Sequence, residues 1–347
     1  MTFAPQSMQA VPASTATYRA TTAQHLITIV LAWWLLGGLF LDGWAHNHLG
    51  ESLETFFTPW HAVFYSGFAA VASWCLYLAS RGWQLGRRGL AAFPDGYGLA
   101  AIGVPLFGLG GIGDLIWHTV FGIEVGIEAL LSPTHLLLFA GGSLILASPM
   151  NAAWKSPTSR RAPLALRWVA TLSATSVLAL TAFIHMYMWG LLSVPQGLGW
   201  AQTRGELSAV LLTALMLATP VLLLLRRFAL PFGAITVMYT LTNTAMALML
   251  APGDWRVPGV ALVCGLLADL LCVLLHPSPV RVWAFRAFAL LLPLAVWVPY
   301  LGGAVWLGLS NLSLELWLGV AVMTGLGGLA LSALVLPPAL PAAALED

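Results

Sequence analysis

The sequence predicts an all-α, polytopic bundle of about ten transmembrane helices. Hydrophobic residues make up 59% of the 347 residues and charged residues only 8%, whereas soluble domains carry roughly a quarter charged residues. The apolar segments run unbroken for about 20 residues, while barrel strands would alternate over about ten. This composition excludes a soluble enzyme, and the net charge of +1 leaves no basic patch for a nucleic acid.

Each predicted span is an apolar segment found with a window of about 19 residues. The spans cover residues 26–46, 59–80, 97–118, 132–149, 165–189, 207–225, 229–251, 257–275, 282–304 and 313–336. They divide the chain into an N-terminal segment (1–24), two helical hairpins (25–150), a transmembrane scaffold (151–337) and a tail (338–347). The first 24 residues lack a charged start and an apolar core, so we expect a permanent first span and no cleaved signal peptide.

The basic residues predict the orientation of the chain. Of the 14 Lys and Arg residues, all but Arg204 and Arg256 fall on one side of the predicted spans. The positive-inside rule then places both termini, and with them the segments 1–24 and 338–347, in the cytoplasm. We therefore expect a multi-pass protein of the inner (plasma) membrane, with its carboxylates and histidines gathered at the outer ends of the helices.

An internal repeat lies at the outer ends of the first four spans. Both copies follow the pattern Asp-x3-His, a linker, and then Glu-x3-[Ser/Thr]-Pro-x-His. The first copy consists of Asp42, His46, Glu54, Thr58, Pro59 and His61, and the second of Asp114, His118, Glu128, Ser132, Pro133 and His135. The repeat indicates that the spans over 26–80 and 97–149 are duplicated helical hairpins.

The spacing within each copy brings its polar side chains together. An Asp and a His four residues apart share one face of a helix. Thr58 and Ser132 are helix caps, and the proline that follows each takes the first helical position. The last His of each copy then lies in the first turn of the returning helix, beside the preceding Asp and His. Glu54 and Glu128 are candidates for a fourth ligand, and His48 is a further candidate in the first copy.

A carboxylate with two imidazoles at a membrane boundary is costly unless the groups are paired or bind an ion. Two His and a carboxylate suit copper, zinc or iron, whereas magnesium and calcium prefer oxygen ligands. The alternative is that these are interfacial polar residues, in which Asp-x3-His is an ion pair with a helix-capping role. Two copies in matched order favour the metal site.

The second copy resembles a known family. Asp114-x3-His118, followed by Ser-Pro-Thr-His135 and an apolar run, resembles the C subunit of the copper membrane monooxygenases, the family of particulate methane and ammonia monooxygenases. That subunit has Asp-x3-His and then Thr-Pro-Ser-His opening the next helix; these residues bind copper, and oxidation of a small apolar substrate has been placed there. The resemblance implies that Asp114, His118 and His135 are copper ligands. Asp42, His46 and His61 are the equivalents in the other hairpin.

Three further residues stand out in the apolar background. His185, near Met186 and Met188, forms a set that suits copper(I) or ordinary helix packing. Asp269 lies inside the predicted span 257–275. Three roles are open for this carboxylate: relay of protons, binding of a cation, or a hydrogen bond to a neighbouring helix. Asn243, within the span 229–251, is expected to make interhelical hydrogen bonds.

The sequence thus predicts an integral membrane metal-binding protein with sites near the outer face, and copper is favoured over zinc and iron. Oxidation of a small apolar substrate, as by a monooxygenase-like oxidoreductase, is the first hypothesis. The second is metal uptake, storage or delivery without chemistry, and the third is secondary transport. The expected partner is the lipid bilayer. Further membrane subunits or a second copy of the chain stay open, and no nucleic-acid partner is expected.

Overall fold

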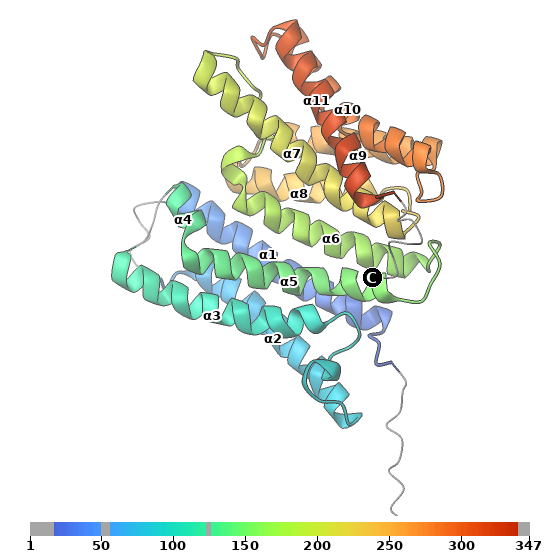
Figure 1. Cartoon of the computed structure of the whole chain (residues 1–347). Coiled ribbons are helices and arrows are strands. Elements are labelled where there is room, and N and C mark those ends of the chain that lie inside the picture. The colour runs from blue at the N-terminus through green and yellow to red at the C-terminus, as the bar shows by residue number, and fades with distance from the viewer. Residues whose placement is uncertain (1–16, 50–55, 123–125, 339–347) are drawn as a thin grey trace, which may run out of the picture.

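The computed structural model describes residues 17–49, 56–122 and 126–338, and these ranges form an all-helical bundle (Figure 1). Its long helices are α1 (Thr22–His48), α2 (Pro59–Gln84), α3 (Gly98–Phe121), α5 (Pro133–Lys155), α6 (Leu164–Ile184), α7 (Trp200–Arg227), α8 (Ala234–Leu250), α9 (Arg256–Leu275), α10 (Val282–Trp306) and α11 (Leu314–Val335). Short helices cover η2 (Gly89–Ala92), α4 (Ile127–Leu131) and η3 (Met186–Met188). Most of the predicted N-terminal segment, and the predicted tail beyond residue 338, lie outside the described residues.

The predicted class of fold is confirmed: the chain is a multi-pass helical membrane protein. Within the described ranges, nine helices are long and apolar enough to cross a bilayer, and α8 is a shorter apolar helix of 17 residues. Trp283 and Trp306, at opposite ends of α10, are 87% and 86% exposed. They are separated by about 35 Å along the helix axis, a separation that suits two aromatic belts at the edges of the hydrocarbon layer.

One predicted span is too long. The segment 165–189 was expected to be continuous, but α6 ends at Ile184 and the chain continues into the short helix η3. The turn carries Trp189 inward, where its indole Nε1 donates a hydrogen bond to Asn243 Oδ1 at 2.9 Å. Asn243 therefore bonds to another segment of the chain, but the predicted interhelical bond is wrong, because its partner Trp189 follows η3 and is not in a helix. The residues beyond Ile184 are apolar because they pack in the core. Hydropathy alone does not distinguish such a buried turn from a continuing helix.

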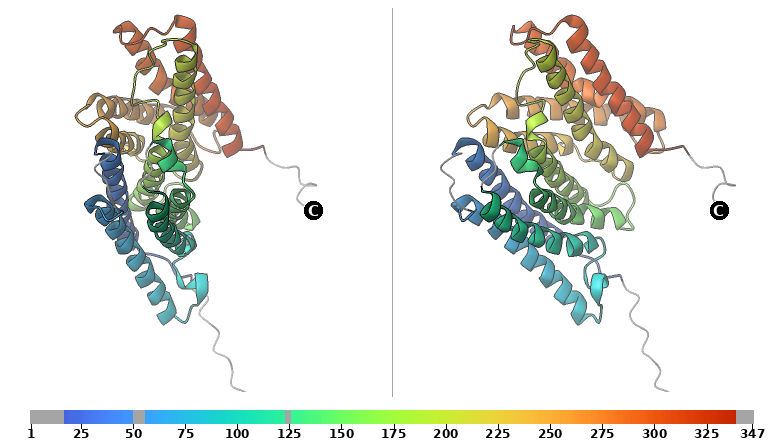
Figure 2. Two further views of the ribbon diagram at one scale, coloured as in Figure 1. Left: turned by 90° about the vertical axis from the view of Figure 1, so that its left-hand side faces the viewer. Right: turned by 60° about the vertical axis from the view of Figure 1, so that its left-hand side comes forward.

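The helices that carry the repeated motif form two pairs, and one helix of each pair packs on α6. Helix α1 packs on α2, and α3 on α5, while both α1 and α5 pack on α6 (Figures 1 and 2). Helix α6 also contacts α8, which leads into the second half of the bundle, where α8 packs on α9, α10 on α11, and α11 on α7. The ends of α1, α2, α3, α5 and α6 thereby surround one region, in which the candidate site lies.

Glycines set the close approach of the helices within each hairpin. A Cβ atom at Gly38 of α1 would lie 2.5 Å from the Cα of Phe64 in α2. In the other hairpin, a Cβ at Gly110 of α3 would lie 2.9 Å from the backbone nitrogen of Leu138 in α5. Small residues permit such backbone contacts between membrane helices. This close packing brings polar side chains on facing helices within reach of each other.

Candidate metal centre

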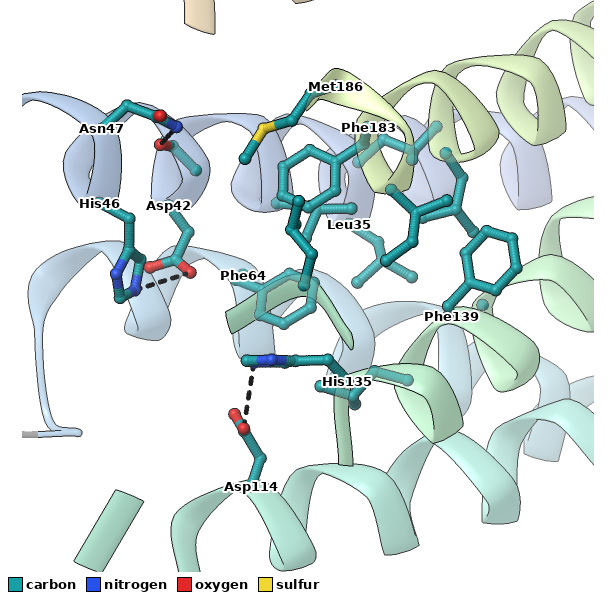
Figure 3. Close-up of a pocket in the computed structure, with 18 of the residues that line it drawn as sticks. Leu35, Asp42, His46, Asn47, Phe64, Asp114, His135, Phe139, Phe183 and Met186 are labelled. Carbon is teal, nitrogen blue, oxygen red and sulfur yellow. Dashed lines mark hydrogen bonds and ion pairs between the residues drawn. The ribbon is translucent and has the colours of Figure 1, made fainter. Parts of the chain in front are cut away.

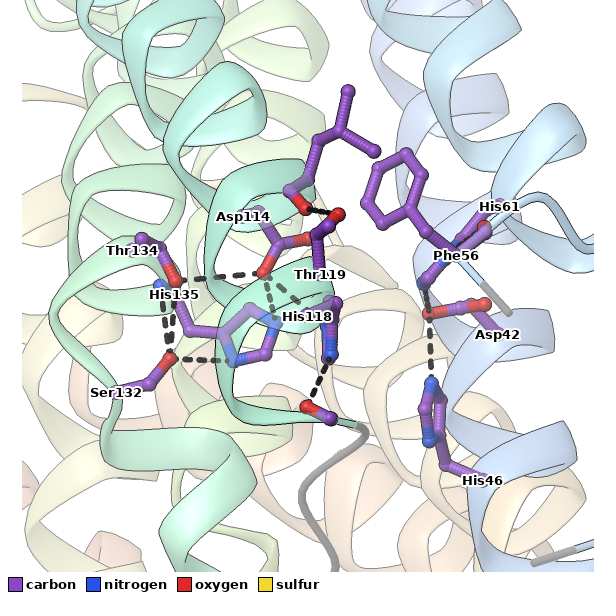
Figure 4. Close-up of polar contacts among 12 residues, drawn as sticks. Asp42, His46, Phe56, His61, Asp114, His118, Thr119, Ser132, Thr134 and His135 are labelled. Carbon is purple, nitrogen blue, oxygen red and sulfur yellow. Dashed lines mark hydrogen bonds and ion pairs between the residues drawn. The ribbon is translucent and has the colours of Figure 1, made fainter. Parts of the chain in front are cut away.

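The first triad consists of Asp42 and His46, in the last two turns of α1, and His61, in the first turn of α2. His61 Nε2 lies 3.3 Å from Asp42 Oδ2, and His46 Nε2 lies 3.8 Å from the same oxygen (Figure 4). The two imidazole ring centroids are 5.9 Å apart. The three side chains therefore converge, as the spacing of the first copy predicts.

The second triad consists of Asp114 and His118 of α3 and His135 of α5. His135 Nε2 lies 3.1 Å from Asp114 Oδ1, and His118 Nε2 lies 3.4 Å from the same oxygen (Figure 4). Asp114 is only 2% exposed, so its carboxylate is shielded from water. In each triad the three ligand atoms lie within 4.8 Å of one another, which makes each a candidate site for a metal ion.

The predicted helix caps position the last His of each triad. Thr58 Oγ1 accepts a hydrogen bond from the backbone N–H of His61 at 3.1 Å, and Pro59 opens α2. Ser132 Oγ accepts the corresponding bond from His135 at 3.3 Å, at the start of α5. A cap followed by a proline fixes where a helix begins, so these predictions are confirmed. The imidazole then returns beside the end of the preceding helix.

Backbone carbonyls orient two of the imidazoles. The Nδ1 atom of His61 lies 2.6 Å from the carbonyl oxygen of Phe56, and that of His118 lies 3.3 Å from the carbonyl of Gly122. A carbonyl only accepts, so Nδ1 carries the hydrogen in both rings. When the ring is neutral, Nε2 is therefore the unprotonated nitrogen, which can bind a metal ion beside the carboxylate. Metal-binding histidines commonly donate one ring N–H to a carbonyl in this way, which presents the other nitrogen to the ion.

A chain of hydroxyl groups orients His135 and Asp114. Thr134 Oγ1 donates to Asp114 Oδ1 at 3.4 Å, because an ionised carboxylate only accepts. Thr134 therefore accepts from Ser132 at 3.2 Å, and Ser132 Oγ accepts the Nδ1–H of His135 at 2.9 Å. The other carboxylate oxygen, Oδ2, accepts a hydrogen bond from the hydroxyl of Tyr65 at 3.1 Å. Three neighbours thus fix the two groups in one geometry.

The donor sets fit a transition-metal ion. Tetrahedral ligands about 2.1 Å from a metal lie about 3.4 Å from one another, and the distances from acid to imidazole are 3.1 to 3.8 Å. His118 Nε2 is buried, and apart from its 3.4 Å contact with Asp114 Oδ1 it makes no hydrogen bond within the described part of the chain. An unsatisfied buried nitrogen is costly, and a bond to a metal removes that cost. Two imidazoles with a carboxylate suit copper, zinc and iron.

The two triads face the same cavity, which has a volume of about 350 Å³ and is lined by all six of their side chains (Figure 3). The ring centroids of His61 and His118 are 6.2 Å apart. The ring of Phe56 lies between the hairpins, with its centroid 4.7 Å from that of His61 and 6.0 Å from that of His118. The triads are therefore a pair, which the sequence did not indicate.

The other residues proposed as ligands that the structure describes lie outside both triads. Glu54 is outside the described residues, and Glu128 is exposed on α4, outside both triads. His48 is also exposed; its ring stacks on Trp44, and its Nδ1 lies 2.9 Å from the carbonyl oxygen of that residue. His185 joins neither triad, although the neighbouring Met186 lines the cavity.

Asp269 has a structural role. It is 2% exposed on α9 and accepts hydrogen bonds from the backbone N–H groups of Ile235 and Thr236, at 3.3 and 2.9 Å, and from the Thr236 hydroxyl at 2.6 Å. These donors are in the first turn of α8, whose own N-cap, Gly233, has no side chain to supply the bonds. Of the three roles that the sequence left open, the hydrogen bond to a neighbouring helix is the one observed.

Comparison of the chain with models of protein families, with curated proteins and with solved structures gives no match.

Proposed function

We propose that the protein is a copper-binding membrane enzyme that oxidises a small apolar molecule in the cavity between its two triads. The observation that carries the proposal is that one cavity joins six candidate metal ligands to a predominantly apolar wall. The remaining lining is mostly leucine and phenylalanine, including Leu35, Phe107, Leu146, Leu180 and Phe183. Ligand sites commonly pair an apolar wall with a few convergent polar groups.

The depth of the cavity favours an apolar occupant. His135, in the first turn of α5, and Leu146, eleven residues further along, both line it. Eleven residues span about 16 Å along a helix, so the cavity extends from the helix ends toward the centre of the bilayer. A molecule that dissolves in the hydrocarbon layer can reach this depth, whereas a site for metal storage has no need of such a wall.

The chain's own residues bind and orient. Asp114, His118 and His135 supply three donors, and Asp42, His46 and His61 supply three more. Bound copper would supply the redox chemistry, with dioxygen as oxidant and an external two-electron donor, so that one oxygen atom enters a C–H bond and the other leaves as water. Copper is preferred over iron and zinc on the resemblance of Asp-x3-His and Ser-Pro-Thr-His to the copper membrane monooxygenases. The leucine and phenylalanine wall positions the substrate and excludes water from it.

Metal uptake, storage or delivery is the second candidate. One observation favours it: the side chains of His46 and His135 are 28% and 26% exposed, so each triad has an imidazole within reach of solvent. Such access permits exchange of the metal with a soluble carrier. Secondary transport loses its main support, since Asp269 is engaged as a cap of α8.

Elemental analysis of the purified, detergent-solubilised protein tests the ligand assignment. We expect two copper ions per chain in the wild type and one in each of the variants His61→Ala and His118→Ala. The matched control is His48→Ala, which removes an exposed imidazole at the same helix end as His46 and should retain both ions. Unchanged copper in both ligand variants would refute the assignment, and a stoichiometric metal other than copper would refute the identity.

An oxidation assay separates the enzyme from the storage protein. The copper-loaded protein is supplied with a quinol reductant, ¹⁸O₂ and cyclohexane, and we expect ¹⁸O-labelled cyclohexanol that is absent with His118→Ala. A fully loaded protein that forms no labelled product from cyclohexane or from shorter alkanes, but releases copper to a soluble chelator within minutes, would favour storage.

A further inference from the structure

Tyr65 lies between the two triads and belongs to neither. It is four residues after His61 on α2, and the two ring centroids are 6.0 Å apart. Its hydroxyl donates to Asp114 Oδ2, at 3.1 Å, although Asp114 is on α3 of the other hairpin. A side chain of the first hairpin therefore holds the acid of the second triad.

The hydrogen bond fixes which carboxylate oxygen faces the imidazoles. Asp114 Oδ1 lies 3.1 and 3.4 Å from the Nε2 atoms of His135 and His118, while Oδ2 is occupied by the hydroxyl of Tyr65. With Oδ2 engaged, the carboxylate is held against rotation about its side-chain bond. A ligand held in its binding orientation loses less freedom when the metal arrives.

The chain provides space for this contact. Gly111 lies three residues before Asp114 on α3, and a Cβ atom at Gly111 would lie 2.8 Å from Cε1 of the Tyr65 ring. Real Cβ atoms do not approach a neighbour so closely, so any larger residue at position 111 would displace the ring. Gly111 gives a second, independent way to disturb the contact without removing the phenol.

We propose that Tyr65 is a positioning residue that couples the two metal sites, so that metal bound at the first triad raises the affinity of the second. The proposal rests on the proposed function, because it requires both triads to bind metal. Ligation of His61 restrains the first turn of α2 further, and Tyr65 is one turn further along the same helix. Binding of the first ion therefore already orders the contact between Tyr65 and Asp114. The second ion then loses less conformational entropy on binding, which gives positive coupling.

Titration with Co²⁺ tests the coupling, because its visible absorption reports both affinity and ligand geometry. In an otherwise wild-type background, we expect His61→Ala to weaken Co²⁺ binding at the second triad. Tyr65→Phe should weaken Co²⁺ binding at the second triad by about 10- to 100-fold and alter the Co²⁺ spectrum of that site. In the Tyr65→Phe background, His61→Ala should have no further effect on the affinity of the second triad. Gly111→Ala should reproduce the effect of Tyr65→Phe.

Two controls separate positioning from loss of structure. Tyr77→Phe alters an exposed phenol further along α2 and should leave both sites unchanged. Tyr65→Phe combined with His118→Ala isolates the first triad, whose affinity should remain that of His118→Ala alone. If Tyr65→Phe leaves the Co²⁺ affinity and spectrum of the second triad unchanged, the coupling through Tyr65 is refuted while the proposed function stands. The same holds if His61→Ala changes the affinity of the second triad equally with and without Tyr65. Failure of the wild type to bind Co²⁺ or copper would instead overturn the proposed function.

Discussion

Ser132 and Thr58 occupy equivalent positions, and their difference yields the sharpest prediction. Both cap a helix through the backbone N–H of the His three residues later. Ser132 also accepts the imidazole Nδ1–H of His135, whereas the Nδ1–H of His61 is bound by the carbonyl of Phe56. Replacing each residue by alanine therefore removes the same cap, but only Ser132→Ala releases a ligand imidazole.

The magnitudes follow from the two roles. Loss of the cap should lower the free energy of unfolding by about 1 kcal/mol in both variants. Loss of the hydrogen bond from His135 Nδ1–H to Ser132 should weaken metal binding at the second triad by about 10- to 100-fold in Ser132→Ala, which corresponds to about 1.4–2.7 kcal/mol. Thr58→Ala should leave the affinity of the first triad within about twofold, since its imidazole keeps the carbonyl partner.

Competition with a chelator of known affinity measures the metal affinity of each triad. Each variant is combined with a ligand substitution in the opposite triad, His61→Ala for Ser132→Ala and His118→Ala for Thr58→Ala, so that one site is followed at a time. Thermal unfolding of the metal-free protein gives the cap contribution. Equal losses of metal affinity in the two variants would refute the assigned role of Ser132, because the cap alone would then account for both.

Two further predictions concern residues outside the triads. Asp269→Ala removes the acceptor of three hydrogen bonds from the first turn of α8. We expect the free energy of unfolding to fall by roughly 1–3 kcal/mol and the metal content to stay unchanged. A fall in metal content would contradict the structural role. Leu180→Trp fills part of the cavity. The variant should retain both metals and weaken the binding of cyclohexane by at least tenfold in a competition assay. Undiminished binding would place the apolar ligand elsewhere.

The local part of each triad is predictable from the sequence. Asp114 and His118 share a helix face because they are four residues apart, and Ser132 with Pro133 marks where the next helix begins. These rules act within a single hairpin, so the convergence of the acid and two imidazoles requires no knowledge of other helices. The same applies to the class of fold, which follows from apolar segments long enough to cross a bilayer.

Other features depend on contacts that are distant in the sequence. Hydropathy assigns Asp269 to a span but does not reveal that its carboxylate reaches the start of α8, since two of its three donors are backbone N–H groups with no sequence signal. The end of α6 at Ile184 was missed for a related reason. Residues beyond it are apolar because they pack inward, as the bond from Trp189 to Asn243 shows, and composition alone does not separate these two causes.

The pairing of the triads is the feature with the largest consequence for function, and it is non-local. Each motif specifies a site within its own hairpin, but the 6.2 Å separation of the His61 and His118 rings depends on how α2 and α3 meet around Phe56 and Tyr65. A repeat in the sequence permits two remote sites equally well. Both acids instead line one apolar cavity. Two ions bound here would therefore act on a single occupant, and loss of either triad should change the reaction of that occupant.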